Sequence, residues 1–168
     1  HHSLAVLDKA LQEKKSRLVL RRGDPIAVLE KLTKETGAEV VAVNTVPDPR
    51  AIAEDETLAA ALKKLGHVFH AFEGALLHDP AKVKTGAGGG FRVYTPFWKA
   101  LVSHAPPSPP IDVPDEWTHP AEWPESVSLS SLDLLPTKPD WSTGFSARWQ
   151  PGEAGARERL AAFVEGAL

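Results

Sequence analysis

The apolar positions of the first 72 residues alternate between helical spacing and short continuous runs. Leu4, Leu7 and Leu11 recur every three or four residues, which predicts a helix that runs from an N-cap at Ser3 to about Lys15. The continuous apolar runs are too short for buried helices, and their length is typical of strands. These runs predict three strands, at residues 17–21, 39–43 and 68–72.

The segments between these runs carry signals for the start and the end of helices. Asp-Pro pairs at 24–25 and 48–49 each place a capping carboxylate before a proline at the first helical position. Gly37 and Gly66 end the two helices that follow. Strands that alternate with helices through short links require crossover connections and a parallel sheet. The sequence therefore predicts an α/β fold.

The character of the chain changes after residue 80. A glycine-rich turn at 86–90 precedes an extended segment at 91–94 and a short helix at 96–102. Prolines are then dense from 105 to 140, where apolar periodicity is lost, and four of the five tryptophans lie between 117 and 149. A disordered linker would be poor in aromatic residues, so we expect a strap that docks by its indole rings. A last helix is predicted at 151–168.

Composition narrows the class of protein. The hydrophobic fraction of 42% and the charged fraction of 24% are those of a water-soluble globular chain, and no apolar stretch is long enough for a membrane helix. The absence of cysteine excludes disulfides and thiol chemistry and fits a cytoplasmic protein. A net charge of −3 offers no general attraction to nucleic-acid phosphates. The lack of any methionine indicates a segment of a longer protein.

Several motifs, taken in order, resemble the DNA photolyase/cryptochrome family. They are Leu-Val-Leu-Arg-Arg-Gly-Asp-Pro at 18–25, Tyr-Thr-Pro-Phe-Trp-Lys at 94–99, Leu-Leu-Pro at 134–136 and Trp-Gln-Pro-Gly-Glu-Ala-Gly-Ala at 149–156. The resemblance implies an N-terminal Rossmann-like antenna domain that often holds a pterin or deazaflavin. It also implies a C-terminal helical domain that binds FAD and repairs pyrimidine dimers in damaged DNA by light-driven electron transfer. No catalytic residue is carried over to this chain.

The resemblance also predicts how the chain is divided. It implies a partial antenna domain at 1–104, an interdomain connector at 105–150 and, at 151–168, the first helix toward the FAD-binding domain. The family sheet has the strand order 3-2-1-4-5, and this chain begins before the third strand, so the first two strands are expected to be missing. We expect either that the remaining strands close into a smaller sheet or that another chain pairs with their exposed edges.

The candidate cofactor-binding residues are Asn44 and Asp48, at the carboxyl end of the second predicted strand. They align with Asn-Arg-Arg-Tyr-Glu-Pro, a family segment beside the antenna cofactor. The residues at 45–47 are Thr-Val-Pro, which removes donors and a stacking ring, so at most weak antenna binding is expected. Helix capping by Asp48 is the favoured interpretation, and it is compatible with a ligand role.

The other candidate sites are weaker. Arg21 and Arg22 end a predicted strand and could meet an anion, although a solvated pair is the simpler interpretation. His67 and His70 are three residues apart on a strand and so face opposite sides, which argues against a shared metal. The glycine run at 86–90 lacks the Lys-Ser/Thr ending of a phosphate loop.

Three functions remain open at this point. The leading one is a catalytically inactive part of a photolyase that repairs cyclobutane pyrimidine dimers. The second is part of a cryptochrome-like blue-light photoreceptor without repair activity. The third is a flavodoxin-like nucleotide-binding module, for which the tryptophan-rich strap would be an unusual addition. The residues that discriminate between repair and signalling would lie in the flavin domain.

Overall fold

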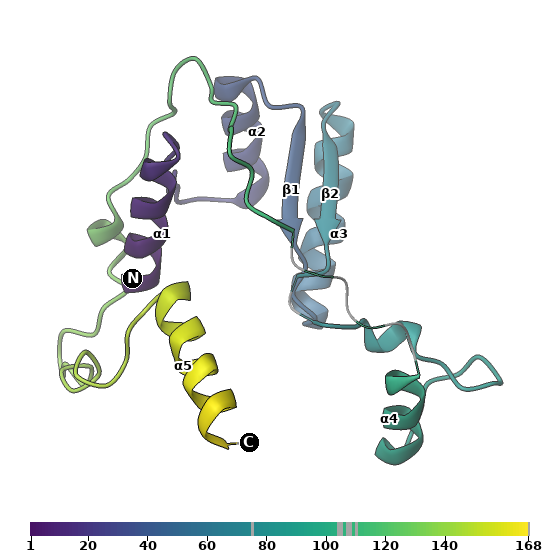
Figure 1. Ribbon diagram of the computed structural model, residues 1–168. Coiled ribbons are helices and arrows are strands. Elements are labelled where there is room, and N and C mark those ends of the chain that lie inside the picture. Colours follow the sequence, from purple (N-terminus) through teal and green to yellow (C-terminus); the bar gives the residue numbers. More distant parts are fainter. Residues whose placement is uncertain (75, 104–105, 107–108, 110, 168) are drawn as a thin grey trace. The chain divides into compact units, whose positions relative to one another are not determined.

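A computed structural model describes residues 1–74, 76–103, 106, 109 and 111–167 (Figure 1). The chain forms two compact units. Residues 1–24 and 114–168 make up the first unit, and residues 25–113 make up the second. In the described part of the chain, no helix is both long enough and apolar enough to cross a membrane.

The second unit contains the alternation of helices and strands that the sequence predicts. Each of its first two helices starts at the proline of an Asp-Pro pair and is followed by a glycine of positive φ, Gly37 at 68° and Gly66 at 85°. Most side chains are strained at such angles, so glycine ends these helices at the least steric cost. The elements are α2 (Pro25–Thr36), β1 (Val40–Asn44), α3 (Pro49–Lys64) and β2 (Val68–Phe72) (Figure 1).

The two strands form a parallel sheet, in which Val40 is opposite Val68 and Asn44 is opposite Phe72. Helix α3 connects the strands and contacts β2, and it also contacts α2. Leu62 of α3 is 0% exposed and Val83 is 3% exposed, which makes them the buried apolar side chains of the described core. The predicted α/β class with a parallel sheet is confirmed.

The second unit continues with η1 (Pro80–Lys82) and α4 (Tyr94–Val102). The predicted short helix is present, but it starts at Tyr94 and so includes a residue that was expected to be extended. The rings of Tyr94 and Trp98 stack one helical turn apart, with centroids separated by 6.3 Å. This i, i+4 contact within the first turns favours the earlier start.

The first unit contains α1 (His2–Glu13), η2 (Leu129–Leu132) and α5 (Glu153–Ala167). The predicted cap at Ser3 is wrong, because α1 starts at His2, with His1 as an N-cap whose side chain makes no capping hydrogen bond. Helix α5 starts two residues later than predicted, and residue 168 of the predicted helix lies outside the described residues.

The predicted strand at 17–21 is wrong. The segment has no regular secondary structure, and the sheet contains β1 and β2 alone among the described residues. Leu20 donates its N–H to Ser126 Oγ (2.8 Å) and accepts from the N–H of Val127 (2.9 Å). A strand needs a ladder of backbone partners, and this segment contacts a loop instead. The expectation that all three runs close into one smaller sheet is therefore wrong.

The predicted connector consists of loops, turns and η2 wherever it is described; its positions 105, 107–108 and 110 lie outside the described residues. Trp123 docks as expected, because the guanidinium of Arg17 lies 5.3 Å from its ring centroid. Trp141 and Trp149 are 65% and 67% exposed. Docking is thus partial at Trp123, which is 37% exposed, and the Trp141 ring contacts the ring of Phe145, four residues further on, at 5.7 Å between centroids.

Candidate functional site

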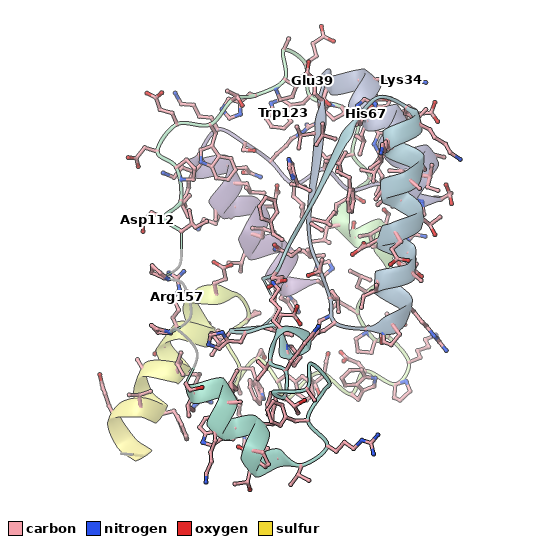
Figure 2. The ribbon with its side chains drawn as sticks, turned by 90° about the vertical axis from the view of Figure 1, so that its right-hand side faces the viewer. Lys34, Glu39, His67, Asp112, Trp123 and Arg157 are labelled. Carbon is pink, nitrogen blue, oxygen red and sulfur yellow. The ribbon has the colours of Figure 1, made fainter. Side chains whose placement is uncertain are left out.

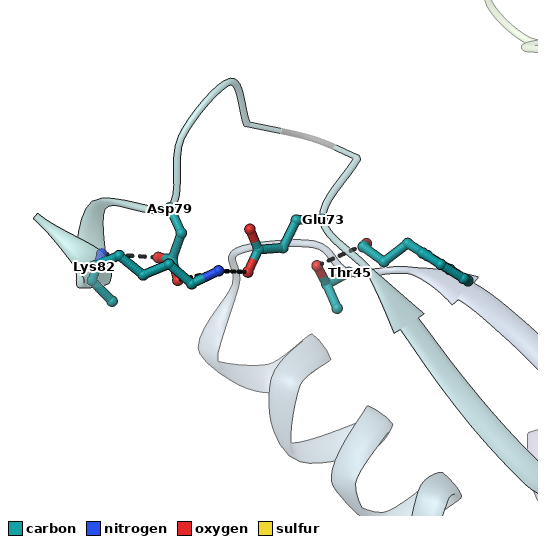
Figure 3. Close-up of polar contacts among 6 residues, drawn as sticks. Thr45, Glu73, Asp79 and Lys82 are labelled. Carbon is teal, nitrogen blue, oxygen red and sulfur yellow. Dashed lines mark hydrogen bonds and ion pairs between the residues drawn. The ribbon is translucent and has the colours of Figure 1, made fainter. Parts of the chain in front are cut away.

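The carboxyl end of the sheet in the second unit carries the predicted ligand residues, where parallel α/β sheets place their ligands. Asn44 is the last residue of β1, opposite Phe72 at the end of β2. The N–H of Thr45 donates to the carbonyl of Phe72 (2.9 Å), and its Oγ1 contacts the same oxygen at 3.2 Å (Figure 3). Two bonds to one carbonyl hold the start of the β1–α3 loop against the end of β2.

The side chain of Asn44 lies directly against the backbone of Gly74. A Cβ atom built on Gly74 would be 3.0 Å from both Cγ and Oδ1 of Asn44. Any larger residue at position 74 would therefore displace the amide by a few tenths of an ångström. Asn44 is itself exposed, so its amide is accessible to a ligand at the sheet end.

Asp48 caps α3, as predicted. Its Oδ1 accepts from the N–H groups of Arg50 (2.9 Å) and Ala51 (3.3 Å), and its backbone is extended. The carboxylate thereby satisfies two of the amide groups that every helix start leaves without an intrahelical partner. Asp48 remains exposed at the surface. Asn44 and Asp48, the two residues predicted from the sequence, thus lie at the same end of the sheet, and Asp48 has a structural role as the cap of α3.

A group of charged residues, Glu73, Asp79 and Lys82, lies beside this loop (Figure 3). Lys82 Nζ is 2.7 Å from Glu73 Oε1 and 3.9 Å from Asp79 Oδ2, and Asp79 caps η1 by accepting from the N–H of Ala81 (2.8 Å). The hydrogen bond and the charge of Glu73 raise the pKa of Lys82, with a smaller contribution from Asp79 against partial desolvation. The three side chains carry a net charge of −1.

Sequence reasoning missed this group, although two signals were present. Asp79 and Pro80 repeat the Asp-Pro device that starts α2 and α3. Glu73 directly follows β2, just as the loop with the predicted ligands follows β1. Residues that follow neighbouring parallel strands meet at the same sheet edge, so Glu73 could have been placed with the site.

The chemistry available at this sheet end is hydrogen bonding. The amide of Asn44 offers a donor and an acceptor, and the carboxylates favour a ligand that presents N–H groups rather than an anion. The described residues contain no cluster of three or more His, Cys, Asp or Glu side chains placed to hold a metal ion. The sheet end thus presents exposed hydrogen-bonding groups, the amide of Asn44 and the carboxylate of Asp48.

The remaining candidates are not brought into this site. His67 precedes β2 at the amino end of the sheet, where Figure 2 also shows Lys34 and Glu39. His70 lies within β2 opposite Ala42. In the glycine run, the N–H groups of Gly88 and Gly89 donate to Thr85, which forms a closed turn.

Arg21 and Arg22, at the end of the 17–21 segment, have separate surroundings. Arg22 donates from Nη2 to the carbonyl of Ser131. Arg21 lines a pocket together with Arg17 and Trp123, in the first unit. Of the predicted arginine pair, Arg22 therefore contacts η2, whereas Arg21 lines a pocket.

Comparison with known proteins gives consistent matches along the chain. The DNA photolyase family matches residues 1–115. A deoxyribodipyrimidine photo-lyase of Agrobacterium fabrum is 46% identical over 168 residues, and cryptochrome-1 of Arabidopsis thaliana is 28% identical over 173. The crystal structure of a bacterial class III photolyase from Agrobacterium tumefaciens is 46% identical, and it superposes with a TM-score of 0.93 over 99% of this chain.

The chain spans only part of these relatives. It covers 35% of the Agrobacterium photo-lyase, 25% of cryptochrome-1 and 35% of the class III photolyase chain. The chain therefore corresponds to about a third or less of the length of each of these proteins.

Proposed function

Because this chain belongs to the DNA photolyase family, we propose that it is the antenna-domain and connector part of a light-driven DNA repair enzyme, a deoxyribodipyrimidine photo-lyase. The observation that carries the proposal is the match over all 168 residues to a photo-lyase at 46% identity, together with a TM-score of 0.93 to a class III photolyase. In this proposal residues 1–104 belong to the antenna domain, 105–150 to the connector and 151–168 to the first helix of the next domain.

The repair chemistry is assigned to the rest of the parent protein. That part would bind FAD and the damaged DNA and would cleave cyclobutane pyrimidine dimers in the light. Two features of this chain support the division. The sheet end offers hydrogen-bonding groups without a nucleophile–base pair, and the net charge of −3 gives no general attraction to phosphate. We accordingly expect the 168-residue chain alone to be inactive and to bind no flavin.

We assign weak antenna binding to Asn44 and Asp48. An antenna pterin or deazaflavin would supply light absorption, and the exposed amide of Asn44 could hydrogen-bond its ring. The fit is partial, because Val46 and Pro47 offer no side-chain donor and no aromatic face, and because Thr45 is already bonded to Phe72. The carboxylate of Asp48 is likewise occupied in part by its capping bonds.

The antenna assignment is tested by titrating the chain with a reduced pterin and following pterin fluorescence. Asn44→Ala removes the amide, whereas Gly74→Ala displaces it by the close contact described above. Both variants should weaken binding, and His67→Gln, at the opposite end of the sheet, should leave it unchanged. Equal affinity in all four proteins would refute the assignment of antenna binding to Asn44.

A second candidate is a blue-light photoreceptor without repair activity. The specific observation in its favour is the match of 99% of this chain to cryptochrome-1 of Arabidopsis at 28% identity. Purified full-length protein distinguishes the two candidates. Flavin absorbance with light-dependent loss of thymine dimers supports the repair enzyme, flavin without repair supports the photoreceptor, and the absence of any flavin would contradict both.

We also propose that the open edge of β1 pairs with a strand of another chain. Within the described residues β1 pairs with β2 alone, and Val40 and Val68 are 49% and 48% exposed. Apolar edges without charged residues favour such pairing. Sedimentation of the 168-residue chain over a range of concentrations should reveal self-association, and Val41→Lys should reduce it.

The cysteine-free composition fits a cytoplasmic location.

A further inference from the structure

One segment of the second unit carries positive charge without any negative charge. Residues 80–111 contain four lysine and arginine residues and no aspartate or glutamate, whereas acidic residues outnumber basic ones, 22 to 19, in the whole chain. One of the four, Lys82, belongs to the charged group described above. The other three, Lys84, Arg92 and Lys99, are exposed, and none of them takes part in an ion pair among the described residues. Three positive charges are therefore available on this segment.

Two aromatic rings lie exposed on the same segment. Tyr94 and Trp98 of α4 stack with an interplanar angle of 17°, and they are 69% and 48% exposed. Large aromatic side chains gain free energy when they are buried, so two neighbouring exposed rings indicate an interaction surface. Every nucleobase has a flat face that can stack on such a ring. The rings therefore add a group that recognises unpaired bases to the charges that attract phosphates.

The local fold braces the backbone that carries these side chains. Phe91 contacts Phe97 edge-on, with centroids 6.2 Å apart, and this contact ties the residue before Arg92 to α4. The backbone beside Lys84 is anchored in the core, because Val83 is 3% exposed. The closed glycine turn lies between these two positions and leads the chain back toward α4 (Figure 1). A braced backbone lowers the entropy that is lost when a ligand binds.

We propose that Lys84, Arg92, Tyr94, Trp98 and Lys99, which we call the basic aromatic surface, bind single-stranded nucleic acid. The three cations contact the phosphates and the two rings stack on unpaired bases. This combination is typical of single-strand sites that do not depend on base sequence. The proposal goes beyond the proposed function, which assigns damaged DNA to the rest of the parent protein, and it does not rest on that function.

An anionic membrane is the other partner that basic and aromatic side chains can attract. Helix α4 has only nine residues, and two of the three cations, Lys84 and Arg92, lie outside it. A helix of this length presents little apolar area to a membrane surface. Phosphates spaced along a flexible strand can instead reach cations on separate pieces of backbone, which favours the nucleic acid.

The test is a titration of a fluorescently labelled, unirradiated oligothymidine of about ten nucleotides with the 168-residue chain, followed by anisotropy. Oligouridine of the same length separates DNA from RNA, and a DNA duplex of that length tests whether bases must be unpaired. We expect saturable binding of at least one single strand and weaker binding of the duplex. The logarithm of the affinity should fall with the logarithm of the salt concentration with a slope of about −2, which corresponds to about −0.7 for each of three phosphate contacts.

Matched variants separate this surface from any general attraction. Trp98→Ala should weaken binding at least about fivefold, because it removes a ring on which a base stacks. Lys99→Gln should weaken binding and reduce the magnitude of the salt slope by about 0.7. Trp141→Ala and Lys9→Gln are the controls, because they remove an exposed indole and an exposed lysine of the first unit, and both should leave the affinity and the slope unchanged.

The salt slope of Lys99→Gln keeps the test decisive even if Trp98→Ala fails to fold, which circular dichroism would reveal. An unchanged slope in Lys99→Gln, equal affinity in Trp98→Ala and Trp141→Ala, or a duplex bound as tightly as the single strands would overturn the proposal. Binding to phosphatidylserine vesicles without binding to either strand would assign the surface to a membrane and would overturn it as well. No light, flavin or damaged base takes part, so these outcomes leave the repair assignment untouched.

Discussion

Replacing Asp48 separates its role as a helix cap from any role in binding. Asp48→Ala removes both capping hydrogen bonds at the start of α3, those to Arg50 and Ala51. Asp48→Asn keeps a side-chain oxygen at the same position and removes only the charge. Because α3 carries the buried Leu62 and contacts β2, weakening the start of this helix should be measurable in the stability of the second unit.

The expected magnitude follows from the geometry of the cap. Loss of an N-cap side chain costs about 1 kcal/mol, within a range of roughly 0.5–2 kcal/mol. The favourable interaction of a carboxylate with the helix dipole is worth about 0.3–1 kcal/mol at an exposed site. We therefore expect Asp48→Ala to lower the free energy of unfolding by about 1–1.5 kcal/mol and Asp48→Asn by about 0.5 kcal/mol.

Urea unfolding followed by circular dichroism at 222 nm measures these differences. Glu54→Ala is the matched control, because it removes a carboxylate from the exposed surface of the same helix without touching its cap. Surface changes of that kind stay within about 0.5 kcal/mol. The pterin titration with Asp48→Asn then reports on the charge alone, in a protein whose helix start is preserved.

The capping account fails if Asp48→Ala is no more destabilising than Glu54→Ala. It also fails if Asp48→Asn is as damaging as Asp48→Ala, since the charge would then matter more than the two hydrogen bonds. The account requires the loss of unfolding free energy to be largest for Asp48→Ala, intermediate for Asp48→Asn and near zero for Glu54→Ala.

Three further results are expected. Leu62→Ala should lower the free energy of unfolding by about 2–5 kcal/mol in urea titrations, because Leu62 is 0% exposed; a cost below about 1 kcal/mol would show that the core is not packed as described. The side-chain and backbone hydrogen bonds from Ser142 lower the pKa of Asp140, and the stability that this carboxylate contributes is lost as pH falls through its folded pKa. Ser142→Ala removes the side-chain hydrogen bond and should therefore raise the pKa of Asp140. An unchanged titration of the Asp140 carboxylate by NMR would contradict this. The pairing of Lys82 with Glu73 contributes to stability below the unfolded lysine pKa of about 10.4, and this contribution is lost as pH rises through the raised pKa of the folded state. Glu73→Gln removes the charge and should return the pKa of Lys82 toward its normal value. An unaltered titration of Lys82 Nζ would refute the pairing.

The elements that the sequence predicted correctly are those whose signals are local. An Asp-Pro pair and a terminal glycine lie within a few residues of the helix that they delimit, so α2 and α3 were placed with correct starts. The run predicted at 39–43 became β1 at Val40–Asn44, one residue later, and the run at 68–72 became β2, because both follow those helices at short distances and can pair with each other. The cap at Asp48 was predictable for the same reason.

The incorrect predictions concern partners that are distant in sequence. Leu18, Val19 and Leu20 have the composition of a strand, but a strand forms only where another backbone can complete its ladder. Residue 20 instead contacts residues 126 and 127, more than a hundred positions away. No sequence pattern near residue 20 predicts that contact. The contact between Arg17 and Trp123 could not be predicted for the same reason. Glu73 and Asp79, by contrast, had local signals from which their place at the sheet end could have been predicted.

We propose that this chain belongs to an enzyme whose repair chemistry is driven by light absorbed by a flavin outside these 168 residues. The most direct measurement is an action spectrum for the loss of thymine dimers from irradiated DNA, catalysed by the full-length natural protein. We predict no loss in the dark and a rate that follows the absorbance of the bound flavin from the near ultraviolet into the blue. Repair in the dark, or no repair at any wavelength with flavin bound, would contradict the account.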